Sequence, residues 1–465
     1  MHATIHDTIH TKITGNFFRT SLAIFQIFVT ISTNVEQILG GMMNILVLGT
    51  GGREHALAWA CAKDDEVKIV YVARGNAGTD IEPKLQNVDL DITDHNALIE
   101  FCQTHDIQFV VVGPEAPLVA GVVDNLRQAG IAVWGPTKYC AQLEGSKAFA
   151  KEFMQKHGIP TAYYQVFTEI EAAKRYVREK GVPIVIKADG LAAGKGVIVA
   201  MDEATAFDAI DDMLDGNKFG DAGSRVVIEQ FLSGEEASFI CMIDGENILP
   251  MATSQDHKRI FEGDTGANTG GMGAYSPAPV VTQMVHDKVI ERVIRPVVEA
   301  MRANGTPYTG FLYAGLMIDE HSDPYVIEFN CRFGDPETQP IMMRLKSSLT
   351  RLIQAGLLGN LPSDAQWLDQ VALGVVLASR GYPESSSKGN IIAGLDTQTD
   401  RLKIFHAGTK KSGDAIVTDG GRVLCVTALA DDIQTAQKDA LAAIESISFD
   451  GMQYRRDIGW RAIKR

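Results

Sequence analysis

The sequence predicts a multidomain protein of the α/β and α+β classes. Apolar strand-like runs alternate with helical stretches between residues 44 and 145, which is typical of a parallel sheet covered by helices on both faces. A glycine-rich hairpin is expected at 184–200, and a further α+β unit begins near residue 371. With 465 residues, 45% hydrophobic and 22% charged, the chain is long enough for about three globular domains.

The first of these units is expected at 43–145. Its apolar strands are ILVLG, KIVYVA, FVVVG and IAVWG, with one helix beginning near Glu54 and another around 94–104. Functional groups of such a sheet lie at the carboxyl ends of its strands. The sequence therefore directs attention to the loops that follow these strands.

The first strand runs into GTGGREH, which predicts a site for a single phosphate at the start of a helix, formed by Gly51, Gly52 and Arg53. A tight turn without a ligand is the alternative. The stretch is close to a dinucleotide fingerprint, which would make the protein a dehydrogenase. Glu54 replaces the third glycine, however, and Ala73 and Arg74 stand where a ribose-binding acid is expected.

A second glycine-rich stretch, IVIKADGLAAGKGV at 184–197, raises the question of a phosphate-binding loop. It departs from the pattern GxxxxGK(S/T), because its loop is one residue short and no hydroxyl follows the second lysine. Strand-like residues on both sides predict a hairpin. Such a hairpin could close over a triphosphate, or be an ordinary turn. The candidate phosphate contacts are Lys187, Gly190, Gly194, Lys195 and Gly196.

Two acids bracket the linker after the strand at 226–232. Glu229 and Glu236 are seven positions apart, so a planar ring could lie against the linker while each acid meets a different end of a nucleoside. Either acid alone would more often lie on the surface. Together with Lys147 and Lys187 they indicate a nucleotide site.

Residues 254–277 form a polar, glycine-rich stretch that is too long for an ordinary connection, so it is either functional or disordered. Its backbone could bind anions near Gly270 and Gly271, with Asp256 and Lys258 as side-chain partners. Glu115, in the proline-flanked loop GPEAPL, would face the crevice of the first unit or else solvent.

The strand PYVIEFN carries the strongest metal signal in the chain. Glu328 and Asn330 are two positions apart and project from the same face, where their oxygens suit magnesium. Arg332 follows two positions later and could neutralise a transferring phosphoryl group. The motif RFGDPET, which begins at Arg332, favours a functional site over a chance occurrence of this pattern.

Composition excludes several classes of protein. A formal charge of −15 without dense basic clusters argues against nucleic-acid binding, and the apolar run at 22–31 is too short to span a membrane. The six cysteines are scattered, which fits a reducing cytoplasm. Residues 1–42 are expected to be a disordered extension, with a targeting segment as the alternative, and 371–465 to be an α+β unit covering the crevice.

The combination of Lys147, Lys187, the glycine hairpin, the two linker acids and the Glu328 and Asn330 pair resembles the ATP-grasp superfamily. More narrowly, residues 43–465 resemble the phosphoribosylamine-glycine ligase family. The motifs that carry this resemblance are GGREHALAW, GNAGT, GPEAPL, LEGSKAF, IKADGLAAGKGV, SQDHKR, NTGGMGAYSPAP, EFNCRFGDPETQ, FHAGT and GGRVLCVTAL. Ala267 departs from the family pattern, which has proline before NTGG, and Leu316 and Met317 stand where a further metal-facing acid is usual.

This resemblance implies an N-terminal parallel-sheet domain at 43–145, an ATP-grasp domain at 146–370 with a glycine-flap subdomain at about 164–232, and a C-terminal α+β domain at 371–465. ATP would be clamped between the two ATP-grasp lobes. The implied ATP contacts are Lys147, Lys187, Gly190, Gly194, Lys195, Gly196, Glu229, Phe231, Leu232 and Glu236. Glu328 and Asn330 would hold Mg²⁺ or Mn²⁺, and Arg332, Lys187 and Asp256 would be catalytic.

The remaining candidates, Gly51, Gly52, Arg53, Glu115, Lys258, Gly270 and Gly271, would contact glycine and 5-phosphoribosylamine. The implied reaction phosphorylates glycine with ATP and passes the glycyl group to the amine of phosphoribosylamine, in a monomer or a weak dimer. The alternatives are a carboxylating ATP-grasp enzyme that acts on bicarbonate, a nicotinamide dehydrogenase and a non-catalytic nucleotide sensor.

Overall fold

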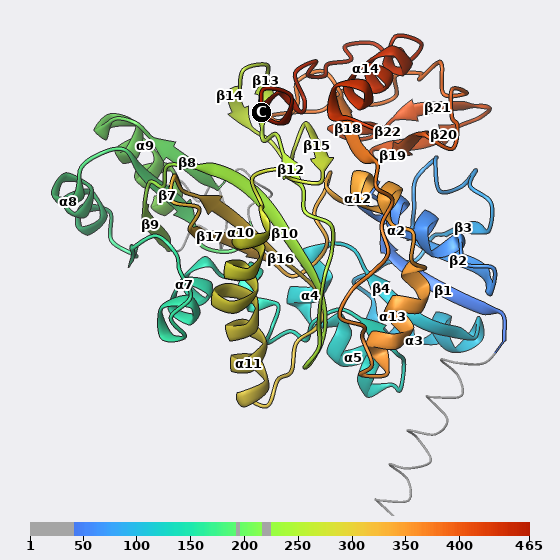
Figure 1. Cartoon of the computed structure of the whole chain (residues 1–465), viewed down its shortest axis with the longest axis horizontal. Coiled ribbons are helices and arrows are strands. Elements are labelled where there is room, and N and C mark those ends of the chain that lie inside the picture. The colour runs from blue at the N-terminus through green and yellow to red at the C-terminus, as the bar shows by residue number, and fades with distance from the viewer. Residues whose placement is uncertain (1–40, 192–195, 216–224) are drawn as a thin grey trace, which may run out of the picture.

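The computed structural model describes residues 41–191, 196–215 and 225–465, and Figure 1 labels its elements where there is room. These residues form four sheets of four or five strands and two two-stranded hairpins. The expected α/β and α+β architecture is confirmed. The predicted extension at 1–42 lies outside the described residues except for its last two positions.

The N-terminal unit is a parallel sheet of five strands in the order β3-β2-β1-β4-β5. The strands are β1 (Met43–Gly49), β2 (Val67–Arg74), β3 (Leu85–Val88), β4 (Ile107–Val112) and β5 (Val133–Trp134), and the helices are α2 (Gly52–Ala62), α3 (His95–Thr104), α4 (Glu115–Ala120) and α5 (Val122–Gln128). The predicted alternation of strands and helices is thus observed. β5 is shorter than the predicted strand because only Val133 and Trp134 pair with β4.

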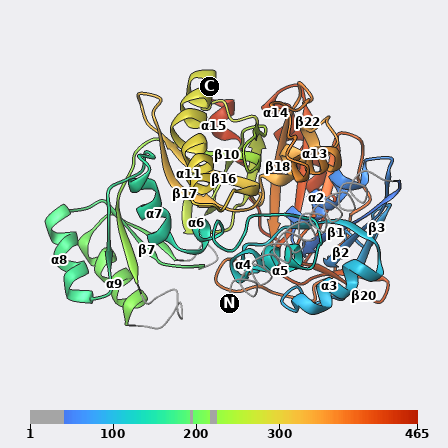
Figure 2. The same ribbon diagram turned by 90° about the horizontal axis from the view of Figure 1, so that it is seen from below.

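The glycine-rich stretch belongs to a small antiparallel sheet with the order β6-β9-β7-β8. Its strands are β6 (Tyr164–Phe167), β7 (Ile184–Ala188), β8 (Val197–Ala200) and β9 (Val226–Gln230), accompanied by helices α8 (Ile170–Lys180) and α9 (Glu203–Leu214). Lys187 pairs with Val197, so the predicted hairpin is confirmed. Figure 2 shows this lobe at one side of the molecule, far from the N-terminal sheet.

The second lobe is an antiparallel sheet in the order β11-β10-β16-β17. It contains β10 (Glu235–Asp244), β11 (Ile248–Pro250), β16 (Thr309–Ile318) and β17 (Pro324–Asn330). The helices along this part of the chain are α6 (Gln142–Gly145), α7 (Lys147–Lys156), α10 (Gln283–Val289), α11 (Arg295–Ala303), α12 (Thr338–Arg344) and α13 (Leu349–Leu357), with a π-helical segment, η2 (Ile290–Ile294), joining α10 to α11.

The C-terminal sheet takes two of its five strands from the middle of the chain. Its order is β12-β15-β18-β22-β19, in which β12 (Gln255–Asp256) and β15 (Gly273–Ser276) join β18 (Val371–Ala378), β19 (Leu402–His406) and β22 (Arg422–Ala430). Two hairpins, β13 (Arg259–Phe261) with β14 (Thr265–Asn268) and β20 (Thr409–Ser412) with β21 (Ala415–Thr418), and helices α14 (Ile433–Ile444) and α15 (Trp460–Ile463), complete the unit. Residues 146–370 are therefore not a closed structural unit.

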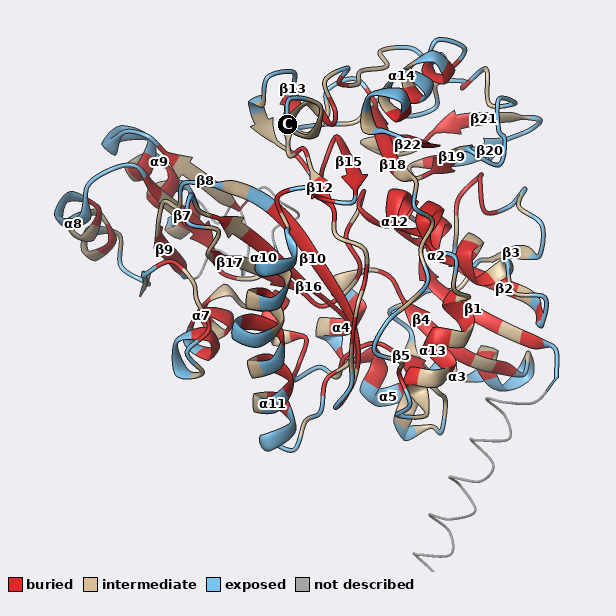
Figure 3. Cartoon of the chain, in the orientation of Figure 1, coloured by how far each residue is buried: buried red, intermediate tan, exposed pale blue. Residues whose placement is uncertain are grey.

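The central strands of these sheets are buried, as Figure 3 shows. One apolar core joins the N-terminal unit to the rest of the protein: Trp134 packs edge-on against Phe311, and Phe311 packs against Phe333. The same core includes Phe405 of the C-terminal sheet. This shared core holds the functional loops of different units in fixed positions. Within the described ranges, no helix has the length and apolarity needed to cross a bilayer.

Candidate active site

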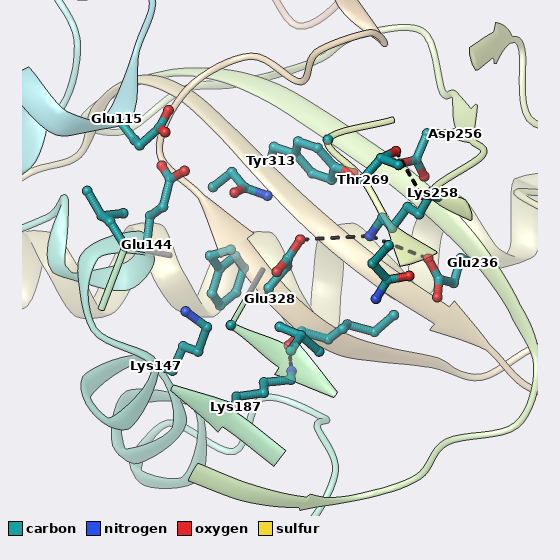
Figure 4. A pocket seen from close by; sticks show the side chains of 18 of the residues that line it. Glu115, Glu144, Lys147, Lys187, Glu236, Asp256, Lys258, Thr269, Tyr313 and Glu328 are labelled. Atoms are coloured by element: carbon teal, nitrogen blue, oxygen red, sulfur yellow. Dashed lines mark hydrogen bonds and ion pairs between the residues drawn. The ribbon is translucent and has the colours of Figure 1, made fainter. Parts of the chain in front are cut away.

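A cavity of about 750 Å³ lies where the lobes and the N- and C-terminal units meet. Its lining includes Arg53 and Glu115 from the first unit, Lys187 and Glu229 from the small lobe, and Arg422 from the C-terminal sheet. The cavity therefore depends on the whole fold. Figure 4 shows the charged side chains that converge on it.

Two predicted lysines approach the cavity from the α7 and β7 side. Lys147 begins α7, and its Nζ donates to the carbonyl oxygen of Gly190 at 2.7 Å. Asp189 accepts from the backbone N–H of Ala148 and from the hydroxyl of Ser146, which ties the hairpin to the start of α7. Lys147, Lys187, Gly190 and Gly196 line the cavity, whereas Gly194 and Lys195 lie outside the described residues.

The predicted nucleoside contacts follow β9. Glu229, Phe231, Leu232 and Glu236 all line the cavity. The side chain of Glu229 is buried and forms ion pairs with Lys187 at 3.0 Å and Lys151 at 2.8 Å, whereas Glu236 is exposed. The two acids thus differ sharply in environment, as expected if one faces a buried ring and the other a solvated sugar.

The predicted metal ligands lie on β17 beside a register shift. Gly315 pairs with Glu328 and Leu316 with Val326, so Ile327 is an extra residue in the strand. Such a bulge re-aims the side chains that follow it. Burial alone would raise the pKa of Glu328, but Lys258, Lys187 and Lys147 hold that pKa below its ordinary value. Glu328 is therefore an anion that attracts cations.

The donor set at this position suits a metal shared with phosphate. Glu328 and Asn330 both line the cavity, and the described residues contain no group of three or more His, Cys, Asp or Glu side chains that could hold a metal by themselves. A carboxylate and an amide oxygen, completed by phosphate oxygens and water, match the preference of Mg²⁺. The residues present therefore fit a phosphate-bound divalent cation.

Arg332 is held from both sides by carboxylates. Its Nη2 lies 2.9 Å from Oε1 of Glu144, and its Nε lies 3.4 Å from Oε2 of Glu115. The other oxygen of Glu144 accepts from the backbone N–H of Cys331 at 2.7 Å. Arg332 also donates to Oδ1 of Asn330. These contacts fix the guanidinium beside the predicted metal ligands.

Asp256 and Lys258 lie together on the opposite wall. Burial raises the pKa of Asp256 to about 7, opposed by Lys258 and assisted by Glu337, Glu236 and Glu328. Although burial would lower the pKa of Lys258, the surrounding carboxylates hold it well above its ordinary value. At neutral pH this wall therefore carries a protonated lysine beside a carboxyl group that is close to half protonated.

The predicted substrate residues are only partly brought together. Arg53, Glu115, Lys258 and Gly270 line the cavity, with Arg53 3.9 Å from Glu115. Gly51, Gly52 and Gly271, all in described ranges, are not among the residues that line the cavity. A β-carbon on Gly52 would meet Gln339, and one on Gly271 would meet Pro336, so these two glycines permit close packing around the motif FGDPET.

The anion site predicted at the start of α2 already holds a carboxylate from the protein. Glu54 reaches back so that its Oε2 accepts from the N–H of Gly51 at 2.7 Å, and its Oε1 pairs with Arg53 at 2.6 Å. Glu54 is buried among Gly49, Gly51 and Gly113, where β-carbons would collide with it. The carboxylate therefore takes the place that a dinucleotide phosphate would need, which excludes the dehydrogenase alternative on structural grounds.

Sequence reasoning missed several polar residues of the cavity. They are Glu144, Lys151, Tyr313, Asp335, Glu337 and Arg422. Lys151 follows Lys147 by four positions, so helical spacing could have placed both on one face. Asp335 and Glu337 belong to the motif FGDPET, but their ion pair with Arg422 and hydrogen bond with Tyr313 join distant segments and leave no local signal.

Known protein families match nearly the whole of the described chain. Residues 43–144, 145–338 and 372–461 match the N, ATP-grasp (A) and C domains of phosphoribosylglycinamide synthetase. Phosphoribosylamine-glycine ligase of Vibrio cholerae serotype O1 is 62% identical over 425 residues, which cover 91% of this chain and 99% of the relative. The enzyme of Neisseria meningitidis serogroup B is 62% identical over 426 residues, covering 91% and 100%.

Solved structures of other proteins share the fold of this chain. Phosphoribosylamine-glycine ligase of Thermotoga maritima superposes with a TM-score of 0.79 at 34% identity, over 90% of this chain and 100% of that one. The biotin carboxylase domain of Hydrogenobacter thermophilus 2-oxoglutarate carboxylase, solved with MgADP and bicarbonate, has a TM-score of 0.68 at 14% identity, over 89% and 92%. This second likeness concerns the fold alone.

The fold and the cavity define an ATP-grasp ligase, in which two antiparallel lobes enclose a lysine-rich site opposite an acid and an amide on one strand. Within that class the chain belongs to the phosphoribosylamine-glycine ligase family, as the three matched domains and the relatives with 62% identity show.

Proposed function

We propose that the protein joins glycine to 5-phosphoribosylamine with ATP, through glycyl phosphate, giving N1-(5-phospho-β-D-ribosyl)glycinamide, ADP and phosphate. This is the second step of purine biosynthesis de novo. The observation that carries the proposal is one cavity in which Lys147 and Lys187 face Glu328 and Asn330, and which extends to Arg53 and Glu115 of the first unit. A triphosphate, a cation and a second substrate can meet there.

The need to phosphorylate glycine explains why lysine and arginine side chains gather in the cavity. A carboxylate is a poor acyl donor because attack by an amine would have to expel oxide, so an oxygen is first phosphorylated. Phosphoryl transfer depends mainly on positioning and charge neutralisation. Lys147 and Lys187 would bind ATP phosphates beside Gly190 and Gly196 of the hairpin, and Arg332, fixed by Glu144, would neutralise the group in transfer.

The nucleoside would lie along the linker after β9. Phe231 and Leu232 would contact the adenine ring, Glu229 its amino group and Glu236 the ribose hydroxyls. A divalent cation, Mg²⁺ or Mn²⁺, held by Glu328 and Asn330, would neutralise phosphate charge. Among the described residues, these are the two oxygen ligands that we assign to the cation, and the lysines would hold the phosphates beside them.

Transfer to the amine would take place between the first and C-terminal units. Arg53, Glu115, Lys258 and Gly270 line this end of the cavity and would contact glycine and phosphoribosylamine, with Gly51, Gly52 and Gly271 shaping the wall behind them. As the amine attacks glycyl phosphate it must lose a proton. Asp256, with a pKa of about 7, is the group we assign to accept it.

The decisive experiment measures ADP release by the purified chain with ATP, Mg²⁺, glycine and freshly generated phosphoribosylamine, and identifies glycinamide ribonucleotide by mass spectrometry. Both products are expected in equal amounts. ADP release that needs bicarbonate and not glycine would instead support a carboxylating enzyme. Nucleotide binding without turnover under any of these conditions would support a sensor.

We also propose that the protein acts in the cytoplasm as a monomer. Its six cysteines are free and buried, which suits a reducing compartment. Small molecules are its expected partners, and neither nucleic acid nor membrane is required. Sedimentation of the full chain at micromolar concentration would detect a weak dimer if one forms.

A further inference from the structure

Lys151 is a buried lysine that the proposed mechanism does not use. It lies on α7 one turn after Lys147, lines the cavity and is 2% exposed. Its Nζ is 2.8 Å from Oε2 of Glu229 and donates to Oγ1 of Thr161 at 2.7 Å. A buried lysine requires partners for its charge, and here an acid and a hydroxyl supply them.

Within the described part of the chain, Glu229 pairs through one of its two carboxylate oxygens. Oε2 forms the ion pair with Lys151 and also accepts a hydrogen bond from Nζ of Lys187 at 3.0 Å. Oε1 is buried and has no hydrogen-bond partner among the residues that the structure describes. A buried carboxylate oxygen without a partner is unfavourable, so this oxygen is poised to accept a hydrogen bond from a ligand in the cavity that Glu229 lines.

Lys151, through Thr161, and Lys187 also connect Glu229 to β17, the strand that carries the proposed metal ligands. Thr161 donates through its hydroxyl to the carbonyl oxygen of Val326 at 2.6 Å, and Lys187 donates to that of Ile327 at 3.1 Å. Both carbonyls lie on β17 just before Glu328. The side chain of Glu229 is thus held from two directions, and its rotation would break one of the two ammonium contacts.

From this arrangement we infer that Lys151 is a positioning and specificity-determining residue: it holds the side chain of Glu229 in place with Oε1 free, so that the cavity selects a base carrying an exocyclic amino group. Adenine donates at that position. Guanine presents a carbonyl oxygen there, which a fixed carboxylate repels. The inference rests on the proposed use of ATP and adds a residue that acts through Glu229 without touching the base.

Lys151→Met tests this assignment. One cation then remains for Glu229, and its carboxylate can turn either oxygen toward Lys187. We expect ATP to bind about tenfold more weakly and the preference for ATP over GTP to fall by at least about tenfold, with kcat at saturating ATP nearly unchanged. Isothermal titration of the full chain with ATP and with GTP measures both affinities. Lys156→Met, an exposed lysine on the same helix, is the matched control.

A pH series separates positioning from simple structural support. Burial lowers the pKa of Lys151 to about 8, opposed by Glu229 and assisted by Lys187, which are the charged groups that face it. Above that pH the free protein loses the ammonium, so the preference of the unmodified protein for ATP should decline. Lys151→Met should show a low preference that does not change over the same range.

Thr161→Val provides a second variant, because it removes the other partner of Lys151 and leaves the ion pair in place. It should shift the ATP preference in the same direction by a smaller factor. An unchanged ratio of ATP to GTP affinity in Lys151→Met, or in Thr161→Val if the first variant does not fold, would overturn the inference. Loss of ATP binding and product formation by the unmodified protein would overturn the proposed function instead.

Discussion

The ammonium nitrogen of Lys258 lies 3.8 Å from Oε1 of Glu328 and 3.4 Å from Oε2 of Glu236. Figure 4 shows the lysine between these two acids, one proposed to bind metal and the other ribose. A protein cation therefore stands beside the proposed position of a divalent ion. We propose that Lys258, once an ion occupies this position, would contact an anionic group such as the carboxylate of glycine.

Lys258→Met should separate these two roles. Removing a cation 3.8 Å from Glu328 strengthens its attraction for a divalent ion, so half-maximal activity should need less Mg²⁺. The KM for glycine should rise about tenfold or more, because a charge-assisted contact is lost. Steady-state kinetics against glycine and Mg²⁺ measure both effects. The exposed Lys346 provides a control, Lys346→Met, and an unchanged glycine KM in Lys258→Met would remove this residue from the glycine site.

The pKa of about 7 at Asp256 predicts a pH dependence of activity. Only the ionised carboxylate can accept a proton from the amine, so kcat should fall as pH drops below about 7. Asp256→Asn should lower kcat and abolish this acidic limb. A pH profile of both proteins checks the assignment, and a limb that persists in the variant would assign the titration to another group.

The same shift affects stability, with a definite sign. The folded-state pKa is raised above the ordinary value of about 3.9, so the fold favours the protonated form. That contribution is complete below the ordinary value and is lost as pH rises through about 7. Between pH 5 and 7.5, unfolding by urea should therefore show a stability loss in the ligand-free protein that is smaller in Asp256→Asn.

Glu328→Gln should reduce ADP release by at least about a hundredfold while leaving the fold intact, because the side chain is partly exposed and the pairing of β17 is made by its backbone. Calorimetric titration with MgATP should show weaker binding, and the Tm should change by no more than about 2 °C. Glu320→Gln, on the exposed turn before β17, is the matched control. Turnover near that of the control would refute the metal assignment.

Asp264 should hold the hairpin of β13 and β14 against the C-terminal end of the chain. Asp264 pairs with the fully buried Arg455 at 2.8 Å and with Arg461, both near the end of the chain. Asp264→Ala should lower the free energy of unfolding by about 2 kcal/mol, because a buried arginine loses one of its acids. Asp450→Ala, which breaks an exposed pair with Arg380, should change it by less than about 1 kcal/mol. Denaturant titration distinguishes the two.

Features with a local signal could be predicted from the sequence. The hairpin of β7 and β8 follows from glycines between β-branched runs, and the common face of Glu328 and Asn330 follows from the two-residue period of a strand. In each case the pattern and the contact that it determines lie within about twenty residues.

Features that depend on contacts across the chain could not be predicted in this way. Gly273–Ser276 has too few side chains to show a strand period, yet it pairs with β18 about a hundred residues later. Glu144 has no local partner that would mark it, since its hydrogen bond and ion pair are with Cys331 and Arg332. The buried position of Glu54 depends on two loops that meet only in the folded sheet.

The strand exchange in the C-terminal sheet has a consequence for how the enzyme can be made and divided. β15, next to the wall that carries Asp256 and Lys258, obtains its second neighbour from β18, which the ribosome synthesises about a hundred residues later. A nascent chain that has reached residue 370 would thus contain the lysines proposed to bind the triphosphate. It would lack the strands of the C-terminal sheet that support the proposed site for the amine substrate. Splitting the chain at that boundary should give two fragments that regain ligation only when they reassemble.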